Sequence, residues 1–193
     1  KFPLNAHLAY LCDRHPEKAQ ILARQLRRNK PLVATMEALI MQTDLDSILQ
    51  SIEKSPPKHF QRLIGIDGLG ASGKSSVADE IKKLHQNTSI IHTDEFYKPF
   101  AERGREAPSH DGVSPDFDWD RLQGQVFDPV LRGFSVTYQS YDWRGDVWGE
   151  WIEIQQGNWI VIVGVYALQS RFFPYYDYTI WCELSRDERI KRM

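Results

Sequence analysis

Residues 63–76 read LIGIDGLGASGKSS, a short apolar run that leads into a glycine-rich loop. Residues 68–75 have the spacing of a phosphate-binding loop, in which glycines permit a tight turn and backbone N–H groups converge on the phosphates. Lys74 can reach the β- and γ-phosphates, and the Ser75 hydroxyl can ligate Mg²⁺. The amphipathic stretch from Ser76 predicts a helix whose N-terminal dipole faces the same anion. The expected nucleotide-binding residues are Gly68, Leu69, Gly70, Ala71, Ser72, Gly73, Lys74, Ser75 and Ser76.

A second interpretation of this stretch is a Gly/Ser-rich turn that merely joins a strand to a helix. We favour the nucleoside triphosphate site because the buried-type strand, the full glycine spacing and the Lys-Ser pair all occur in the required order.

The composition is that of an ordinary globular chain. With 193 residues, of which 41% are hydrophobic, it can bury a core as one domain plus an appendage. The net charge of −2 provides no basic field, so we expect no nucleic-acid partner. Cys12 and Cys182 have no metal-type or redox-type spacing, which fits a reducing compartment. No apolar run is long enough to span a bilayer and no signal peptide is recognisable, so we expect a cytoplasmic protein without membrane contact.

The N-terminal part predicts helices. Apolar residues recur there at the spacing of one helix face, and Asp44 is a candidate N-cap for the second run. The two runs are Leu32, Val33, Met36, Leu39 and Ile40, and Leu45, Ile48, Leu49 and Ile52. Pro56 and Pro57 then end any helix. We therefore expect an N-terminal helical region with a proline linker over residues 1–57 and a second domain over residues 58–193.

From Arg62 onward, short apolar runs alternate with helical ones, which predicts an α/β fold with a doubly wound, mostly parallel sheet. The expected strands are 63–67, 89–92, 159–163 and 178–182, with a hairpin of 135–141 and 151–154. The expected helices carry Val77, Ile81 and Leu84, and then, over residues 119–131, Leu122, Val126 and Val130, toward the sheet. Ligands of such sheets bind at the carboxyl ends of the strands.

An acidic pair, Asp94 and Glu95, follows the second expected strand at that edge. A carboxylate there could accept the proton of a substrate hydroxyl as it attacks a γ-phosphoryl group. Alternatively, the Asp could cap a helix or hold a Mg²⁺-bound water.

These motifs together resemble the phosphoribulokinase/uridine kinase family of P-loop kinases. The matching segments are IGIDG (64–68), GKS (73–75), HTDEFY (92–97), DFDW (116–119), YDW (141–143) and GVYAL (164–168), and they span residues 60–193. The resemblance implies a P-loop kinase fold that uses ATP and Mg²⁺ to phosphorylate a hydroxyl of a small metabolite, with a ribonucleoside such as uridine or cytidine as the best substrate. It makes Asp94 the general base, Lys74 the residue that stabilises the phosphates, and Ser75 and Asp94 the metal ligands.

The resemblance also implies an acceptor pocket. Phe96 or Tyr97 would line it, and Asp118 matches the position that holds ribose hydroxyls, with Asp116 as the rival assignment. Tyr141 and Asp142 match a pair that encloses the base or sugar. The alternative is that the aromatic residues of this region, Trp119, Tyr138, Tyr141 and Trp143, are packing residues of a hairpin.

Two departures from the family pattern matter. Val163 stands before Gly164, where the family usually has a Glu that positions Mg²⁺ or its waters. Either Asp67, Asp94 or Glu95 supplies the missing carboxylate, or phosphoryl transfer is weak. The run 185–193 predicts the start of a helix, and the resemblance implies that a phosphate-clamping lid follows beyond Met193, so that the domain is truncated before it.

Three hypotheses follow for the function. The first is a uridine kinase-type enzyme. The second is a nucleotide-binding regulatory module in which Val163 has removed efficient catalysis and the N-terminal helices bind a partner. The third is a kinase for pantothenate, nicotinamide riboside or a sugar. The apolar N-terminal faces are expected to pack on their own domain, although a homo-oligomer contact would use the same faces.

Overall fold

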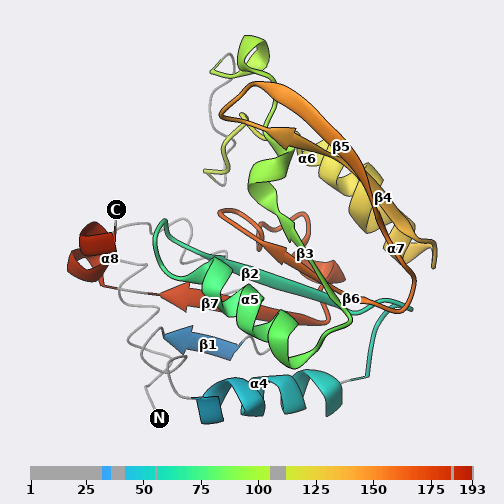
Figure 1. Ribbon diagram of the computed structural model, residues 1–193, viewed down its shortest axis with the longest axis vertical. Helices are drawn as coiled ribbons and strands as arrows, with labels where there is room; N and C mark the ends of the chain where they lie inside the picture. The colour runs from blue at the N-terminus through green and yellow to red at the C-terminus, as the bar shows by residue number, and fades with distance from the viewer. Residues whose placement is uncertain (1–31, 36–41, 55, 105–111, 184, 193) are drawn as a thin grey trace.

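The computed structural model describes residues 32–35, 42–54, 56–104, 112–183 and 185–192. Its centre is a five-stranded parallel sheet with the order β1-β7-β2-β6-β3 (Figure 1). The strands are β1 (Leu32–Thr35), β2 (Leu63–Gly68), β3 (Thr88–His92), β6 (Trp159–Val163) and β7 (Tyr178–Glu183). The four strands expected from the sequence are confirmed, and so is the α/β class with a parallel sheet.

The register of the sheet brings the ends of three strands together. Ile66 of β2 lies opposite Val163 of β6, and His92 of β3 lies opposite Val163 from the other side. The segments that follow these strands therefore begin at the same edge of the sheet. This is the edge where parallel α/β sheets bind their ligands.

One face of the sheet is covered by α4 (Gln42–Lys54) and α5 (Lys74–Leu84), which lie beside each other in Figure 1. Both helices place apolar residues at helical spacing against the strands. The core on this face includes Ile48, Leu49, Ile52, Val77, Ala78 and Ile81 from the helices and Ile64, Ile66, Val161, Val163, Ile180 and Cys182 from the sheet. Cys182 is a buried free thiol, as expected, whereas Cys12 lies outside the described residues.

The other face is covered by a helical run composed of α6 (Trp119–Leu122), a π-helical turn (Gln123–Phe127) and α7 (Asp128–Leu131). The Asp128 N–H donates to the carbonyl of Gln123, and the next residue, Pro129, has no N–H. The missing donor accounts for the wider turn at this point. Leu122, Val126 and Val130 are buried against the sheet, as the sequence predicts.

A hairpin extends from this second layer. Strands β4 (Val136–Asp142) and β5 (Val147–Ile154) pair antiparallel, with an irregular register between Gln139 and Tyr141. Val136, Tyr138 and Ile154 belong to the same core cluster as the helical run. Short 3₁₀ helices, η1 (Thr93–Phe96), η2 (Phe100–Glu102) and η4 (Phe173–Tyr175), connect the layers, and α8 (Arg186–Arg192) confirms the helix expected after residue 185.

Three local predictions are wrong. Leu32 and Val33 belong to the edge strand β1, which pairs with β7, because a short apolar run has no period of its own and the sheet offers a hydrogen-bonding partner. Asp44 lies inside α4, which begins at Gln42, so it is not the N-cap. Leu84 is 41% exposed because it is the last residue of α5, where the chain leaves the sheet surface.

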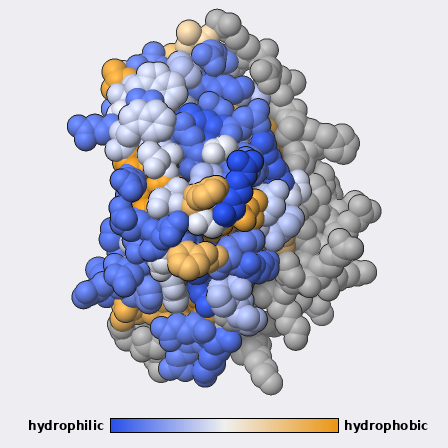
Figure 2. Space-filling view, turned by 90° about the vertical axis from the view of Figure 1, so that its right-hand side faces the viewer, coloured by the Kyte–Doolittle hydropathy of each residue, from blue (hydrophilic) through white to orange (hydrophobic). Residues whose placement is uncertain are grey.

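The remaining N-terminal predictions fall outside the described residues, which exclude 1–31 and 36–41. The division at residue 57 therefore stays a prediction, although β1 and α4 join the sheet and the core of the rest of the chain. On the face shown in Figure 2, hydrophobic residues form small separate patches in a mostly hydrophilic surface. No helix in the described ranges has the length and apolar character that a membrane span requires.

Candidate active site

The phosphate loop, residues 68–75, connects β2 to α5 at the carboxyl edge of the sheet. Its backbone is strained in places: Ala71 has φ 58° and Gly68 has φ 152°. A Cβ at Gly68 would collide with the carbonyl oxygen of Cys182 on the neighbouring strand. A glycine is therefore required where β2 turns into the loop, and the Ser72 N–H closes the turn on the Leu69 carbonyl at 3.2 Å.

Two polar side chains of the loop are buried in a way that suits an anion. The Lys74 ammonium donates to the Leu69 carbonyl at 2.9 Å, and burial lowers the pKa of Lys74 while the carboxylates of Asp67 and Asp94 oppose that shift. The Ser72 hydroxyl is buried and has no hydrogen-bond partner among the described residues. An orphaned hydroxyl and a confined ammonium inside a strained loop fit a bound phosphate chain.

Asp67 fastens the phosphate loop to the segment after β6. One of its carboxylate oxygens accepts the Gly68 N–H at 2.6 Å, and the other accepts the Leu168 N–H at 3.0 Å. The side chain is almost completely buried, and this burial raises the pKa of Asp67 from 3.8 to about 6. Since both oxygens already accept backbone N–H groups, Asp67 does not offer a metal ion a free carboxylate.

The segment after β6 lies close against the turn after β3. Gly164 has φ 155°, and a Cβ there would collide with the Thr93 hydroxyl, which donates to the Val165 carbonyl at 3.3 Å. Val163, which replaces the family's Glu, is 1% exposed and belongs to the core. The position before Gly164 therefore supplies packing to the sheet and no ligand.

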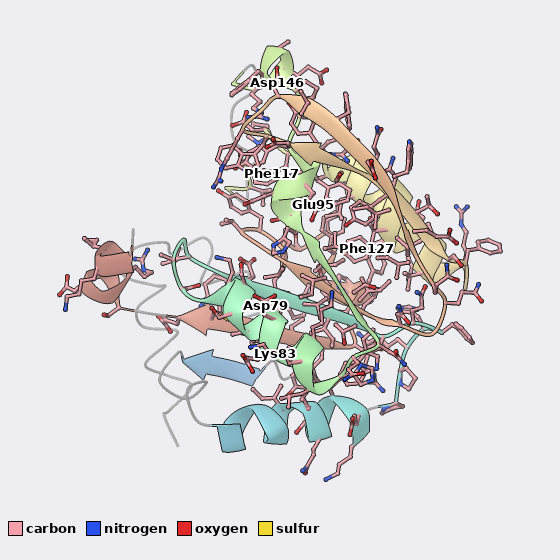
Figure 3. All side chains as sticks on the ribbon, viewed as in Figure 1. Asp79, Lys83, Glu95, Phe117, Phe127 and Asp146 are labelled. Atoms are coloured by element: carbon pink, nitrogen blue, oxygen red, sulfur yellow. The ribbon has the colours of Figure 1, made fainter. Side chains whose placement is uncertain are left out.

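Asp94 and Glu95, although adjacent, face different surroundings. The Asp94 side chain is exposed, and its charge acts on Lys74 and on Tyr97. Glu95 instead accepts the His92 N–H at 3.3 Å, and burial together with the Glu95 carboxylate raises the pKa of Tyr138. Figure 3 places Glu95 near Phe117, well away from Asp79 and Lys83 on α5. Of the three carboxylates considered for the missing Glu, Asp94 is the accessible one.

The described residues contain no group of three or more His, Cys, Asp or Glu side chains that could hold a metal ion. Ser75 and Asp94 are both exposed at the edge of the phosphate loop. One hydroxyl and one carboxylate fit Mg²⁺ that keeps most of its waters and binds mainly through the substrate phosphates.

An aromatic cluster lies beside Asp94. It consists of Tyr97, Phe117, Trp119, Trp143 and Tyr166. The Tyr97 and Phe117 rings stack with centroids 4.0 Å apart, and Phe117 and Trp119 stack at 4.6 Å. Tyr166, held at φ 66°, meets Phe117 edge-on at 6.0 Å. Sequence reasoning did not assign Phe117 or Tyr166 to the site, although both lie in the DFDW and GVYAL segments that carry the family resemblance.

Backbone hydrogen bonds hold this cluster on two segments that run beside each other. The Lys98 N–H donates to the Asp116 carbonyl at 2.8 Å, and the Asp118 N–H donates to the Phe96 carbonyl at 2.6 Å. Tyr97 and Asp118, which the sequence assigns to the acceptor pocket, are therefore brought together. Asp116 is engaged elsewhere, because its carboxylate accepts the Gly104 N–H at 2.7 Å.

The remaining predicted pocket residues have different positions. Phe96 is 0% exposed and stacks on Tyr138 in the core, so it cannot contact an acceptor in this conformation; η1 points Phe96 inward and leaves Tyr97 half-buried. The Tyr141 hydroxyl is hydrogen-bonded to Asp146 in the hairpin turn. Asp142 is exposed at the end of β4 and accepts the Arg144 N–H at 3.0 Å.

The chain is similar in sequence to known kinases. No family model matches the chain. The chain is 40% identical over 83 residues to uridine-cytidine kinase B of Dictyostelium discoideum. The matched region covers 41% of this chain and 34% of that protein. It is 30% identical over 141 residues to a uridine kinase of Staphylococcus carnosus. This matched region covers 67% of this chain and 65% of that protein. These similarities support a place in the phosphoribulokinase/uridine kinase family of P-loop kinases.

A solved structure confirms the fold. A possible uridine kinase from Bacillus stearothermophilus superposes with a TM-score of 0.63 at 19% identity, over 76% of this chain and 83% of that chain. The chain spans about a third of the Dictyostelium protein and just under two thirds of the Staphylococcus protein.

Proposed function

We propose that this protein is an ATP-dependent kinase that transfers the γ-phosphate to a hydroxyl of a small metabolite, best a ribonucleoside such as uridine or cytidine. The observation that carries the proposal is the position of Asp94, an exposed carboxylate at the end of β3 whose charge acts on Lys74. Phosphoryl transfer depends chiefly on positioning and electrostatic stabilisation, so a carboxylate and a cation near the phosphates are the groups that it needs.

In the proposed reaction, the loop N–H groups and Lys74 bind the triphosphate. The oxygen of the acceptor hydroxyl attacks the γ-phosphorus while Asp94 accepts the proton of that hydroxyl. The bond between the γ-phosphorus and the oxygen that bridges it to the β-phosphate breaks, and ADP is released. When bound through Ser75 and Asp94, Mg²⁺ supplies charge neutralisation on the phosphates. Lys74 stabilises the charge that develops on the leaving oxygens, which requires it to exchange the Leu69 carbonyl for phosphate.

A ribonucleoside suits the acceptor side for two reasons. The half-buried Asp118 carboxylate accepts the Arg121 N–H and still has lone pairs for hydrogen bonds from the hydroxyls of a vicinal diol, and Tyr97 with its stacked neighbours offers a ring surface for a base. The relatives named above are a uridine-cytidine kinase and a uridine kinase. Tyr141 and Asp142 remain proposed acceptor contacts. A homo-oligomer, a cytoplasmic location and the absence of a nucleic-acid partner also remain proposals.

A second function is favoured by one observation, the buried Val163 in place of the family's Glu. With a single accessible carboxylate near the phosphates, the chain could bind ATP as a regulatory module with little turnover. A kinase for pantothenate, nicotinamide riboside or a sugar is the third candidate, because the strand-end carboxylate suits any alcohol.

The deciding experiment measures ADP release from ATP and Mg²⁺ with uridine, cytidine, nicotinamide riboside, pantothenate and fructose, and identifies the product by mass. Stimulation by uridine or cytidine supports the first function, and stimulation by nicotinamide riboside, pantothenate or fructose supports the third. Tight ATP binding without turnover for any acceptor supports the regulatory module.

A further inference from the structure

Arg121 of α6 is a buried cation that contacts three separate elements. Its side chain is 8% exposed. One terminal nitrogen, Nη2, donates to the Glu95 carbonyl of η1 at 2.8 Å, and the other, Nη1, donates to the Gln139 carbonyl of β4 at 2.5 Å. Its Nε lies 3.5 Å from the Asp118 carboxylate at the start of α6, and its backbone N–H donates to the same carboxylate at 3.0 Å.

Two aromatic rings enclose this guanidinium. Its central carbon lies 4.5 Å from the Phe96 ring centroid and 5.0 Å from that of Trp148. Burial lowers the pKa of Arg121, and Asp118 and Glu95 oppose that shift. A buried cation costs stability unless its hydrogen bonds are satisfied. The planar fork of arginine donates to two carbonyls in fixed directions while its Nε faces the Asp118 carboxylate as an ion pair, an arrangement that a lysine ammonium cannot reproduce.

The elements that carry the polar partners of Arg121 each hold or adjoin a residue of the proposed acceptor side. The η1 turn carries Asp94 and is followed by Tyr97, α6 begins after Asp118, and β4 leads to Tyr141. These residues are far apart in the sequence, and the described structure joins them through the Arg121 guanidinium. The hydrogen bonds of the phosphate loop do not involve it.

We propose that Arg121 is a positioning residue that fixes Asp94, Asp118 and the β4 end relative to one another, and so sets the geometry of the acceptor side without touching the nucleotide. The proposal rests on the proposed function. A misplacement of reacting groups by about 1 Å can cost on the order of 10²-fold in rate, so loosening this contact should reduce acceptor use far more than ATP binding.

Arg171 provides the matched control. It also pairs with a carboxylate of α6, Asp120, at 2.6 Å, and its guanidinium also lies over a ring, that of Phe172, at 5.4 Å. Its side chain is 40% exposed, so this pair should contribute little. R121K and R171K therefore remove the same chemical group from a buried and an exposed site.

The experiment compares the wild type, R121K and R171K by two measurements in the full chain. The first is amide hydrogen exchange of residues 93–97, 118–122 and 136–142. The second is ADP release with uridine as the probe, together with the ATP dissociation constant. We expect R121K to speed exchange in all three segments and to lower kcat/KM for uridine by about 10²-fold, with ATP affinity within about twofold of the wild type. R171K should match the wild type in both measurements.

Faster exchange confined to α6, or an equal effect of R171K, would overturn the proposal. Loss of ATP affinity in R121K equal to the loss of turnover would also overturn it, because the effect would then be general. If uridine does not stimulate the wild type, the proposed function is wrong for this acceptor. The exchange measurement then still tests whether Arg121 holds the three segments together.

Discussion

The two sides of the candidate site are held in place by different means. The nucleotide side, residues 67–76, depends on backbone: a strained loop, a glycine pressed against Cys182, and amide N–H groups that converge on Asp67. The acceptor side has two backbone hydrogen bonds between its segments and otherwise depends on side chains, namely the aromatic cluster around Phe117 and the buried Arg121. The first kind of geometry is set by a local motif, whereas the second is set by contacts between distant segments.

The largest effect is expected from K74A on the nucleotide side. Removing the ammonium should lower turnover by at least about 10³-fold, because it is the loop cation that stabilises the developing phosphate charge. The acceptor side does not depend on Lys74, so hydrogen exchange of residues 93–97 should not change. ADP release and exchange on the same sample check this. Substantial acceptor-dependent turnover in K74A would separate Lys74 from the chemistry.

D94N tests the point at which the two sides meet. As a general base, Asp94 should contribute about 10²–10⁴-fold to turnover, and because Mg²⁺ binds mainly through the phosphates, the amide should lower ATP affinity much less than turnover. The check is to measure the ATP dissociation constant in the presence of Mg²⁺, together with turnover, for D94N and the wild type. An equal loss of ATP affinity would assign Asp94 to the metal and leave the base unidentified.

F117L tests the aromatic cluster. Phe117 stacks on both Tyr97 and Trp119, and such pairs contribute about 0.5–1.5 kcal/mol beyond their buried area. The expected result is a rise of up to about tenfold in KM for the acceptor, with the KM for ATP unchanged. A matched change in both constants would mean that the two sides are not independent.

The smallest effect concerns Asp67 and pH. Burial raises its pKa from 3.8 to about 6, so the folded state binds the proton more tightly than the unfolded chain. This contribution to stability is therefore fully present below about pH 4 and is lost as the pH rises through about 6. Between pH 7.5 and pH 5 the wild type should gain about 1 kcal/mol relative to D67N, measured by denaturant unfolding. If the free energies of unfolding of the wild type and D67N changed equally with pH, the raised pKa of Asp67 would be contradicted.

The same contrast explains what the sequence could predict. The phosphate loop, the four central strands and the strand-end Asp94 follow from a local motif and from apolar runs of adequate length. Strand β1 was missed because its four residues have no period, and the sheet that receives it is built much later in the chain. The inward position of Phe96 depends on the local turn η1, which spacing alone does not specify.

The contacts of Asp67 and Arg121 could not be predicted for a different reason. Asp67 reaches Leu168, and Arg121 reaches Glu95 and Gln139, and these partners are neighbours only after the sheet and the hairpin have formed. An Asp before a phosphate loop and an Arg in a short helix have no distinguishing pattern. The role of a buried charged residue can be inferred only when the groups that it contacts are known.

The most direct test of the central claim is ADP formation by the wild type at saturating ATP and Mg²⁺, with and without uridine. The account predicts that ADP formation rises with uridine concentration, reaches saturation and yields an equal amount of phosphorylated nucleoside. ADP formation that is the same at every uridine concentration, in a protein that binds ATP, would contradict the assignment of the aromatic cluster and Asp94 to a nucleoside acceptor.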